Sequence, residues 1–169
     1  MGEYSHLSHM FLPIFDENSE VLILGSFPSV KSREQGFYYG HPQNRFWKVI
    51  AALCEEAVPE TIEEKKAMLW KHHIAIWDVI DSCDIIGSSD SSIKNVVPAD
   101  IAGLLAKTKI ERIFANGKIA EKLYNEYVKE QTGKKISVLP STSPANAACS
   151  FEKLAESWRK VIGDIKCLK

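Results

Sequence analysis

The sequence predicts an α/β fold in which a central four-stranded parallel sheet lies between two layers of helices. Two observations predict it. Short apolar runs typical of buried strands alternate with longer runs of helical period, and 169 residues with 45% hydrophobic residues suit a single core. Strands separated by helices join through right-handed crossovers, which build a parallel sheet covered on both faces. We therefore expect residues 1–169 to form one domain.

Four short apolar runs are the expected strands. The first, Val21 to Leu24, ends at Gly25, and the second runs from Ile74 to Ile80. Arg112 to Ala115 and Lys135 to Leu139 supply the third and fourth. Their length and apolar character favour buried strands over helices.

Amphipathic segments between these strands are the expected helices. The segment after Asn44 is apolar nearly all round, which predicts a helix buried on most sides. Thr61 with Glu64 three residues later forms a capping box, which opens a helix to about Lys71. Two further stripes of helical spacing lie at Ile119, Leu123 and Tyr127, and at Phe151, Leu154, Ala155, Trp158 and Ile162.

Function is expected in the loops at the carboxyl ends of the strands, where open α/β sheets bind ligands. These loops comprise residues 25–45, 78–98, 116–117 and 140–150. Three of them are longer or more polar than the ~2 to 6 residues that a connection needs.

The loop after the first strand lacks both glycine-rich phosphate-binding patterns, which argues against a nucleotide-binding loop of either kind. It instead places aromatic residues among cations, which suits stacking on a nucleobase beside a phosphate chain. The aromatics are Phe27, Phe37, Tyr38 and Tyr39, and the cations are Lys31, Arg33 and Arg45. Because Tyr38 and Tyr39 are adjacent, we do not expect both to point inward.

Three segments resemble motifs of the uracil-DNA glycosylase superfamily. Gly-Ser-Phe-Pro-Ser at 25–29 and His-Pro-Gln-Asn-Arg-Phe-Trp-Lys at 41–48 resemble its first motif, and Leu-Pro-Ser-Thr-Ser-Pro-Ala-Asn at 139–146 resembles its second. Phe27 stands where the first motif has a catalytic asparagine, which makes the chain most similar to the hypoxanthine-DNA glycosylase branch. The resemblance implies a monofunctional DNA glycosylase of base excision repair that hydrolyses the N-glycosidic bond of a deaminated base, with hypoxanthine the favoured substrate.

The resemblance also implies roles for individual residues. It assigns catalysis to Asn44 and Asn116, and binding of the flipped base to Ser26, Phe27, Pro28 and Tyr39. Contact with DNA falls to Lys31, Ser32, Ser141, Thr142, Ser143 and Pro144. No metal or cofactor is implied, and the partner is DNA that contains a deaminated base.

Simpler interpretations of the same residues stay open. Asn44 precedes a helical run and could be only a helix cap, and Asn116 before Gly117 could be a turn or a cap. Asp78 follows a strand, but Asp81 and Asp84 share its neighbourhood, so none of the three is assigned a role. The alternative functions are a uracil or mismatched-thymine DNA glycosylase and a non-catalytic nucleic-acid-binding relative.

The formal net charge of −1 at first argues against nucleic acid as a partner. That neutrality is a cancellation, because residues 31–48 carry +3 and residues 101–169 carry +6, against −4 in residues 1–30 and −6 in residues 49–100. The basic segments hold the glycosylase-like motifs, so we expect salt-sensitive DNA binding through a local patch.

The expected compartment is the cytoplasm, the bacterial or archaeal cytosol and nucleoid. Cys54, Cys83, Cys149 and Cys167 are too far apart for Cys-x-x-Cys pairs and are expected to be reduced thiols. No apolar run approaches the ~20 residues that span a bilayer, and a monomer is the default expectation.

Overall fold

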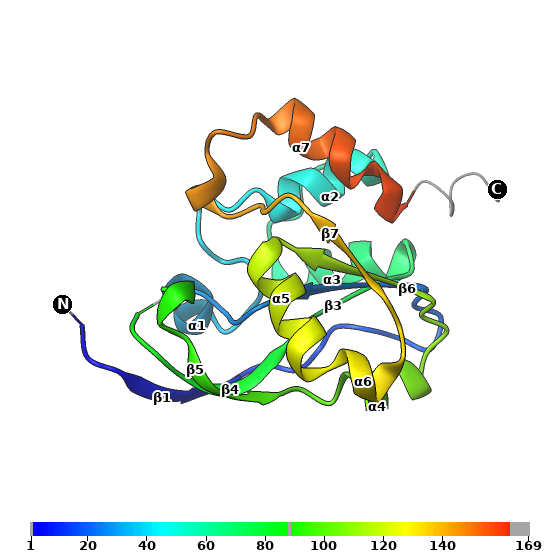
Figure 1. Ribbon diagram of the computed structural model, residues 1–169. Helices are drawn as coiled ribbons and strands as arrows, with labels where there is room; N and C mark the ends of the chain where they lie inside the picture. The colour runs from blue at the N-terminus through cyan, green and yellow to red at the C-terminus, as the bar shows by residue number, and fades with distance from the viewer. Residues whose placement is uncertain (1, 88, 163–169) are drawn as a thin grey trace.

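The computed structural model describes residues 2–87 and 89–162 and contains a parallel sheet with helices on both faces (Figure 1). The strand order is β3-β2-β6-β7, and all three neighbouring pairs are parallel. The strands are β2 (Val21–Gly25), β3 (Ile74–Asp78), β6 (Arg112–Asn116) and β7 (Ile136–Leu139). The four predicted strands and the fold class are confirmed, except that the second strand ends at Asp78 and not at Ile80.

Strand β2 lies inside this sheet, and all five of its residues are buried. Because successive side chains of a strand point to opposite faces, Val21 and Ile23 enter one apolar core, whereas Leu22 and Leu24 enter the other. This explains why the strand reads as a continuous apolar run.

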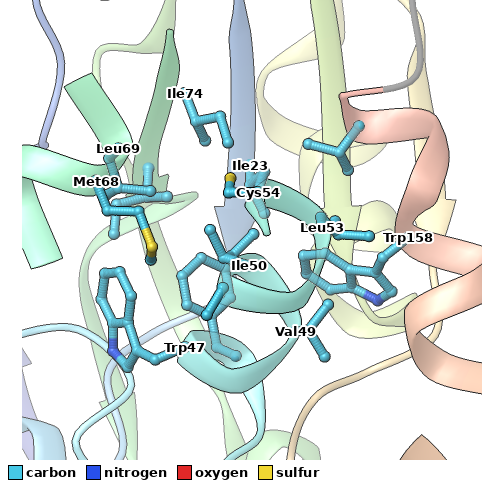
Figure 2. Close-up of a cluster of buried hydrophobic side chains, with 14 of the residues drawn as sticks. Ile23, Trp47, Val49, Ile50, Leu53, Cys54, Met68, Leu69, Ile74 and Trp158 are labelled. Carbon is cyan, nitrogen blue, oxygen red and sulfur yellow. The ribbon is translucent and has the colours of Figure 1, made fainter. Parts of the chain in front are cut away.

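Helices α2 (Phe46–Cys54), α3 (Ile62–Lys71) and α7 (Phe151–Trp158) enclose the first core. As predicted, α2 is buried nearly all round, because it lies between the sheet and α7 (Figures 1 and 2). Figure 2 shows Trp47 and Ile50 of α2 beside Met68 of α3, with Trp158 of α7 on the other side.

The predicted capping box opens α3. Thr61 Oγ1 accepts a hydrogen bond from Glu64 N at 3.1 Å, and Glu64 Oε1 accepts one from Thr61 N at 3.3 Å. Two backbone N–H groups that would lack helical partners are thereby satisfied.

The second face combines helices with a sheet that the sequence did not predict. Helices α4 (Ile101–Ala106), α5 (Lys118–Tyr127) and α6 (Lys129–Thr132) share this side with antiparallel strands β1 (Ser5–Ser8), β4 (Ile80–Ile85) and β5 (Lys94–Pro98). Strands β4 and β5 occupy most of the segment expected to be the loop 78–98. Strand β1 is mostly exposed and polar, so it shows no apolar pattern.

Helix α5 forms as predicted, but its buried stripe is rotated by about one residue. Ala120, Leu123 and Tyr124 are buried, whereas Ile119 is 39% exposed. Tyr124 is drawn inward because its hydroxyl can donate to Lys134 O at 2.8 Å. A buried tyrosine hydroxyl needs a hydrogen-bond partner, and Lys134 O supplies one. Tyr124 is therefore buried, although the spacing of apolar residues predicted that Ile119 and Tyr127 would be.

Short elements complete the described chain: α1 (Val30–Gln35) and the 3₁₀ turns η1 (Asp90–Ser92), η2 (Pro144–Asn146) and η3 (Arg159–Val161). Cys83 and Cys149 carry free thiols, and Cys167 lies outside the described residues, as does the end of the expected domain, 163–169. Within residues 2–87 and 89–162, no helix has both the length and the apolar character needed to cross a bilayer.

Trp158 is expected to contribute strongly to stability, because it is fully buried, packs edge-on against Phe46 and donates from Nε1 to Pro140 O at 2.8 Å. Trp158→Ala should lower the free energy of unfolding by about 3–5 kcal/mol, the usual cost of truncating a buried aromatic. Trp158→Phe should cost less, because it keeps most of the packing and loses the indole hydrogen bond. Urea denaturation measures both, and a loss below about 1 kcal/mol for the alanine variant would contradict the assigned packing.

Candidate active site

The carboxyl ends of the parallel strands open into a cavity of about 360 Å³. The register aligns Gly25 of β2 with Asp78 of β3, and Asn116 of β6 with Leu139 of β7, so the following loops leave from one edge of the sheet. All twelve residues that the sequence assigned to catalysis, base binding or DNA contact line this cavity. The structure thus brings them together, while their chemical roles stay predictions.

Serine side chains fasten the loop after β2. Ser29 Oγ accepts a hydrogen bond from Ser32 N at 3.1 Å and caps α1, and Ser32 Oγ accepts one from Gly40 N at 2.9 Å. Ser32 is 2% exposed and supports the loop, while its expected contact with DNA stays a prediction. Lys31 is exposed and pairs at the surface with Glu34 at 3.5 Å, so its ammonium group can reach a phosphate.

Both tyrosines of this loop turn inward, contrary to the expectation for adjacent residues. Tyr39 adopts a φ of 54°, a left-handed conformation that changes the direction of its side chain. Tyr38 is 2% exposed and donates to Leu12 O at 2.9 Å, while the Tyr39 ring stacks on Phe46 with centroids 4.0 Å apart. Burial, and then the nearby Asp78 carboxylate, raise the pKa of both phenols, so both hydroxyls stay protonated at neutral pH.

Phe27, Pro28 and Ser26 form the cavity wall nearest β2. The guanidinium of Arg33 lies 5.8 Å from the centre of the half-buried Phe27 ring and donates to Pro28 O at 3.0 Å. Ser26 Oγ lies 3.4 Å from Asp90 Oδ1, to which it donates. Burial raises the pKa of Asp90. An apolar ring therefore stands beside polar groups in the space where a base would lie.

Asn44 bonds to the first residue of a helix and lines the cavity, although the N-cap of that helix is Arg45 and not Asn44. Its Oδ1 accepts a hydrogen bond from Phe46 N at 2.9 Å, at the start of α2. The next residue, Arg45, ties α2 to the last loop, because its guanidinium donates to Cys149 O at 2.6 Å and Asn146 O at 3.1 Å. The carboxamide of Asn44 is therefore held in a fixed orientation at the cavity.

Asn116, at the end of β6, is bonded to Thr142 of the last loop. Asn116 Nδ2 donates to Thr142 Oγ1 at 3.0 Å, and Thr142 N donates to Asn116 Oδ1 at 3.0 Å. Thr142 is fully buried and fixes the position of Asn116, while its expected contact with DNA stays a prediction. The Asn116 amide carries a second N–H, which lies near the Tyr39 hydroxyl and can donate to that oxygen or to a ligand.

The remaining residues of the last loop are less buried. Ser141 Oγ accepts a hydrogen bond from Ser143 N at 3.0 Å, and Ser143 Oγ accepts one from Ala145 N at 3.2 Å. Ser141, Ser143 and Pro144 are all half-buried and line the cavity. They are therefore placed where a DNA backbone could approach the opening.

Asp78 and His9 are polar residues to which the sequence assigned no role. Asp78 is 4% exposed and lines the cavity, and its Oδ2 lies 2.8 Å from Nε2 of His9. Among the aspartates left unassigned, Asp81 is exposed and Asp84 pairs with His6 on the outer sheet, so only strand register could have distinguished Asp78. His9 precedes the first predicted strand and carried no signal.

The described part of the chain contains no group of three or more histidine, cysteine, aspartate or glutamate side chains arranged to hold a metal ion. The polar groups at the cavity are carboxamides, hydroxyls and carboxylates, together with the Lys31 ammonium group and the His41 imidazole. These can donate and accept hydrogen bonds with a base, a sugar or a water molecule.

Comparison with known proteins identifies related sequences. A family model described as the uracil DNA glycosylase superfamily matches residues 12–165. A hypoxanthine DNA glycosylase of Methanosarcina acetivorans is 37% identical over 153 residues, which cover 89% of this chain and 95% of that protein. A hypoxanthine DNA glycosylase of Methanosarcina barkeri is 36% identical over 86 residues, 50% of this chain and 54% of that protein.

A solved structure shares the fold. The solution NMR structure of a Methanosarcina acetivorans protein, described there as a candidate uracil DNA glycosylase, superposes with a TM-score of 0.81 and 33% sequence identity. The match covers 94% of this chain and 98% of that one. The similarity of fold therefore extends over nearly the whole chain.

Replacing Thr142 by valine tests the link between β6 and the last loop. Thr142→Val keeps the shape but leaves the Asn116 amide without its acceptor, so the free energy of unfolding should fall by about 1–3 kcal/mol. Ser143→Ala, in the same loop but less buried, should cost less than about 1 kcal/mol. Urea denaturation distinguishes the two, and equal losses would show that the Asn116–Thr142 contact is not special.

Proposed function

Because the chain belongs to the uracil DNA glycosylase superfamily, we propose that it is a monofunctional DNA glycosylase that removes hypoxanthine, the deaminated form of adenine, from DNA. The reaction hydrolyses the bond between C1′ of the deoxyribose and the base nitrogen, a step of base excision repair. The observation that carries the proposal is that Asn44, Asn116 and Phe27 converge on one cavity. The two relatives named above are both hypoxanthine DNA glycosylases.

The base must leave the duplex before it can react, and the cavity supplies the place that receives it. Its volume of about 360 Å³ lies in the range of small-ligand sites, roughly 300–1,000 Å³. Phe27 is half-buried and offers an aromatic face. Tyr39 already stacks on Phe46 with one face, so its other face is the one that a base could meet. These rings would hold the flipped base by stacking.

Cleavage of the bond develops negative charge on the departing base and positive charge on the sugar. Fixed donors aimed at the base stabilise that distribution of charge. Asn116 would donate through its second N–H, since its first N–H and its carbonyl oxygen are bonded to Thr142. Backbone N–H groups of residues 26–29 would supply further donors.

Asn44 would hold the attacking water. Its Oδ1 uses one lone pair on Phe46 N and has a second, and its Nδ2 adds two donors. A neutral carboxamide is a weak base, but the oxocarbenium-like sugar is strongly electrophilic, so positioning of the water contributes most. Phe27, at the place of the superfamily's first-motif asparagine, has no group that could do this.

Contact with the DNA backbone would come from Ser141, Ser143 and Lys31, which line the cavity. Pro144 follows these serines and would fill the space left in the base stack. Such contacts fix the register of the protein on DNA, whereas the cavity reads the base.

The decisive experiment measures base release from a duplex with one deoxyinosine, followed by alkaline strand cleavage. The protein should release hypoxanthine, so that alkali cuts this duplex at the inosine position, and a matched deoxyuridine duplex tests the uracil alternative. Asn44→Ser should abolish cleavage yet keep stability within about 1 kcal/mol, because serine also caps helices. Asn44→Ala should lose activity together with about 0.5–2 kcal/mol of stability.

Asn125→Ala, on the exposed side of α5, is the matched control and should retain full activity. An active Asn44→Ser variant would return Asn44 to a purely structural role. Absence of base release from both duplexes would leave the non-catalytic alternative.

Lys31→Ala should weaken binding to any duplex severalfold and reduce the slope of log K against log salt by about 1, the effect of one lost phosphate contact. Lys107→Ala, at the exposed end of α4, serves as the control and should change neither quantity. Fluorescence anisotropy between 50 and 200 mM salt, roughly the range in which such contacts are resolved, provides the measurement. Equal slopes for the wild type and Lys31→Ala would remove Lys31 from the interface.

A further inference from the structure

A buried histidine and aspartate lie behind the cavity and have no part in the mechanism above. The Asp78 side chain is 6% exposed and the His9 side chain 4%, and their Oδ2 and Nε2 atoms are 2.8 Å apart. A carboxylate oxygen only accepts, so Nε2 carries the proton in this hydrogen bond. His9 precedes residues 12–165, the part of the chain that the family model matches.

His9 is held firmly in this position. Strand β1 pairs with β4, with Ser8 opposite Ser82, and His9 N then donates to Asp81 O at 2.6 Å. The imidazole ring packs edge-on against Phe11, with centroids 4.7 Å apart. The amino-terminal segment thus holds the His9 Nε2–H in a fixed position beside Asp78 Oδ2.

The second oxygen of Asp78 stands over Gly25. A Cβ atom placed on Gly25 would lie 2.5 Å from Asp78 Oδ1, so this oxygen occupies space that any other residue at position 25 would fill. Among the described residues, the hydrogen bond recorded for this carboxylate is the one from His9 to Oδ2. The Tyr39 hydroxyl lies 3.2 Å from the same Cβ position and is buried without a hydrogen-bond partner in that part of the chain, so it stands beside Oδ1 at the cavity. Asp78 and Gly25 both line the cavity, so this acceptor is available to a ligand there.

Asp78 and Asn116 stand on opposite sides of Gly25. Strand β3 pairs Asp78 with Gly25, and strand β6 pairs Ala115 with Leu24, which places Asn116 beside Gly25 on the other flank. Asp78 supplies an acceptor and Asn116 supplies a donor. The end of β2 thus separates two groups of opposite hydrogen-bonding character.

Deamination reverses the hydrogen-bonding character of a base edge. Adenine presents an amino donor at C6 and an acceptor at N1, whereas hypoxanthine presents a carbonyl acceptor at C6 and an N1–H donor. An acceptor beside a donor therefore matches the deaminated edge, and adenine would direct its N1 lone pair at the carboxylate. A site with buried polar groups rejects a ligand that leaves them unpaired.

We propose that Asp78 is the specificity-determining residue that accepts the ring N–H of the deaminated base, and that His9 is a positioning residue that fixes the Asp78 carboxylate. The inference rests on the proposed function, because it names the group by which that site distinguishes its substrate. Asn116 donates to the carbonyl of the same edge. The amino-terminal segment is then part of the active site.

Substitution of Asp78 by asparagine has a directed effect because of His9. The His9 Nε2–H still needs an acceptor, so the carbonyl of the introduced carboxamide turns towards it and the NH₂ group of that carboxamide faces the base. A donor then opposes the N1–H of hypoxanthine and suits N1 of adenine. Asp78→Asn should therefore lower the preference for inosine over adenine by at least about tenfold, within the range that a lost polar contact produces.

The test measures dissociation constants for duplexes that carry the non-hydrolysable 2′-fluoro analogues of deoxyinosine or deoxyadenosine, and for an abasic duplex. Wild-type protein should prefer the inosine duplex. Asp78→Asn and His9→Ala should lose that preference while binding the abasic duplex within twofold of wild type, and His9→Gln should restore part of it through its amide donor. His6→Ala is the matched control, because His6 also pairs with an aspartate, Asp84, but on the exposed outer sheet.

Three results would each overturn the inference. The wild type could show no preference for the inosine duplex, Asp78→Asn could keep that preference, or His9→Ala could bind the duplexes as His6→Ala does. Circular dichroism verifies that the variants are folded. If His9→Ala does not fold, His9→Gln still tests the role of His9. Base release by the wild type is measured separately. Its absence would contradict the proposed function but not the role of Asp78, because the binding preference does not depend on base release.

Discussion

The register of the parallel strands is the constraint on which the rest of the structure depends. Pairing of β2 with β3 brings Asp78 to Gly25, and pairing of β6 with β7 brings Asn116 to Leu139, where the last loop begins. A slip of one residue would turn each of these side chains to the other face of the sheet. Because both faces of β2 are buried, its apolar residues resist such a slip. The cores of the protein thereby set the geometry of the cavity.

Buried polar contacts convert this register into a fixed arrangement of loops. Arg45 joins the start of α2 to the backbone of the last loop, and the Asn116–Thr142 pair joins that loop to β6. Each contact is made by a side chain at or next to the cavity, so positioning and support come from the same short segments. Ser32 and Thr142 illustrate this support: both line the cavity, and both are buried and bonded to neighbouring segments of the loops.

Much of this arrangement could be predicted from the sequence, because β2, α2 and the α3 capping box are encoded by local patterns. The family and the grouping of the motif residues around one cavity were also predictable, since three segments carry specific motifs. The outer sheet was not, because β1 is short, polar and mostly exposed. Tyr39 pointed inward against expectation, since its left-handed backbone is not visible in residue order. A role for His9 could not be predicted from the sequence, because it depends on the contact with Asp78, which is 69 residues away.

A structural role and a catalytic role need not be alternatives for Asn44. A carboxamide has two ends, and its oxygen has two lone pairs, so one bond to Phe46 N leaves capacity for a water molecule. A free asparagine would lose rotamer entropy on holding that water, whereas one already fixed by a helix N–H has lost it during folding. The bond from Phe46 N is therefore what makes a weakly basic group useful, because it holds the group in place before the substrate arrives. The same reasoning applies to Asn116, whose bonds to Thr142 leave one N–H directed by the fold.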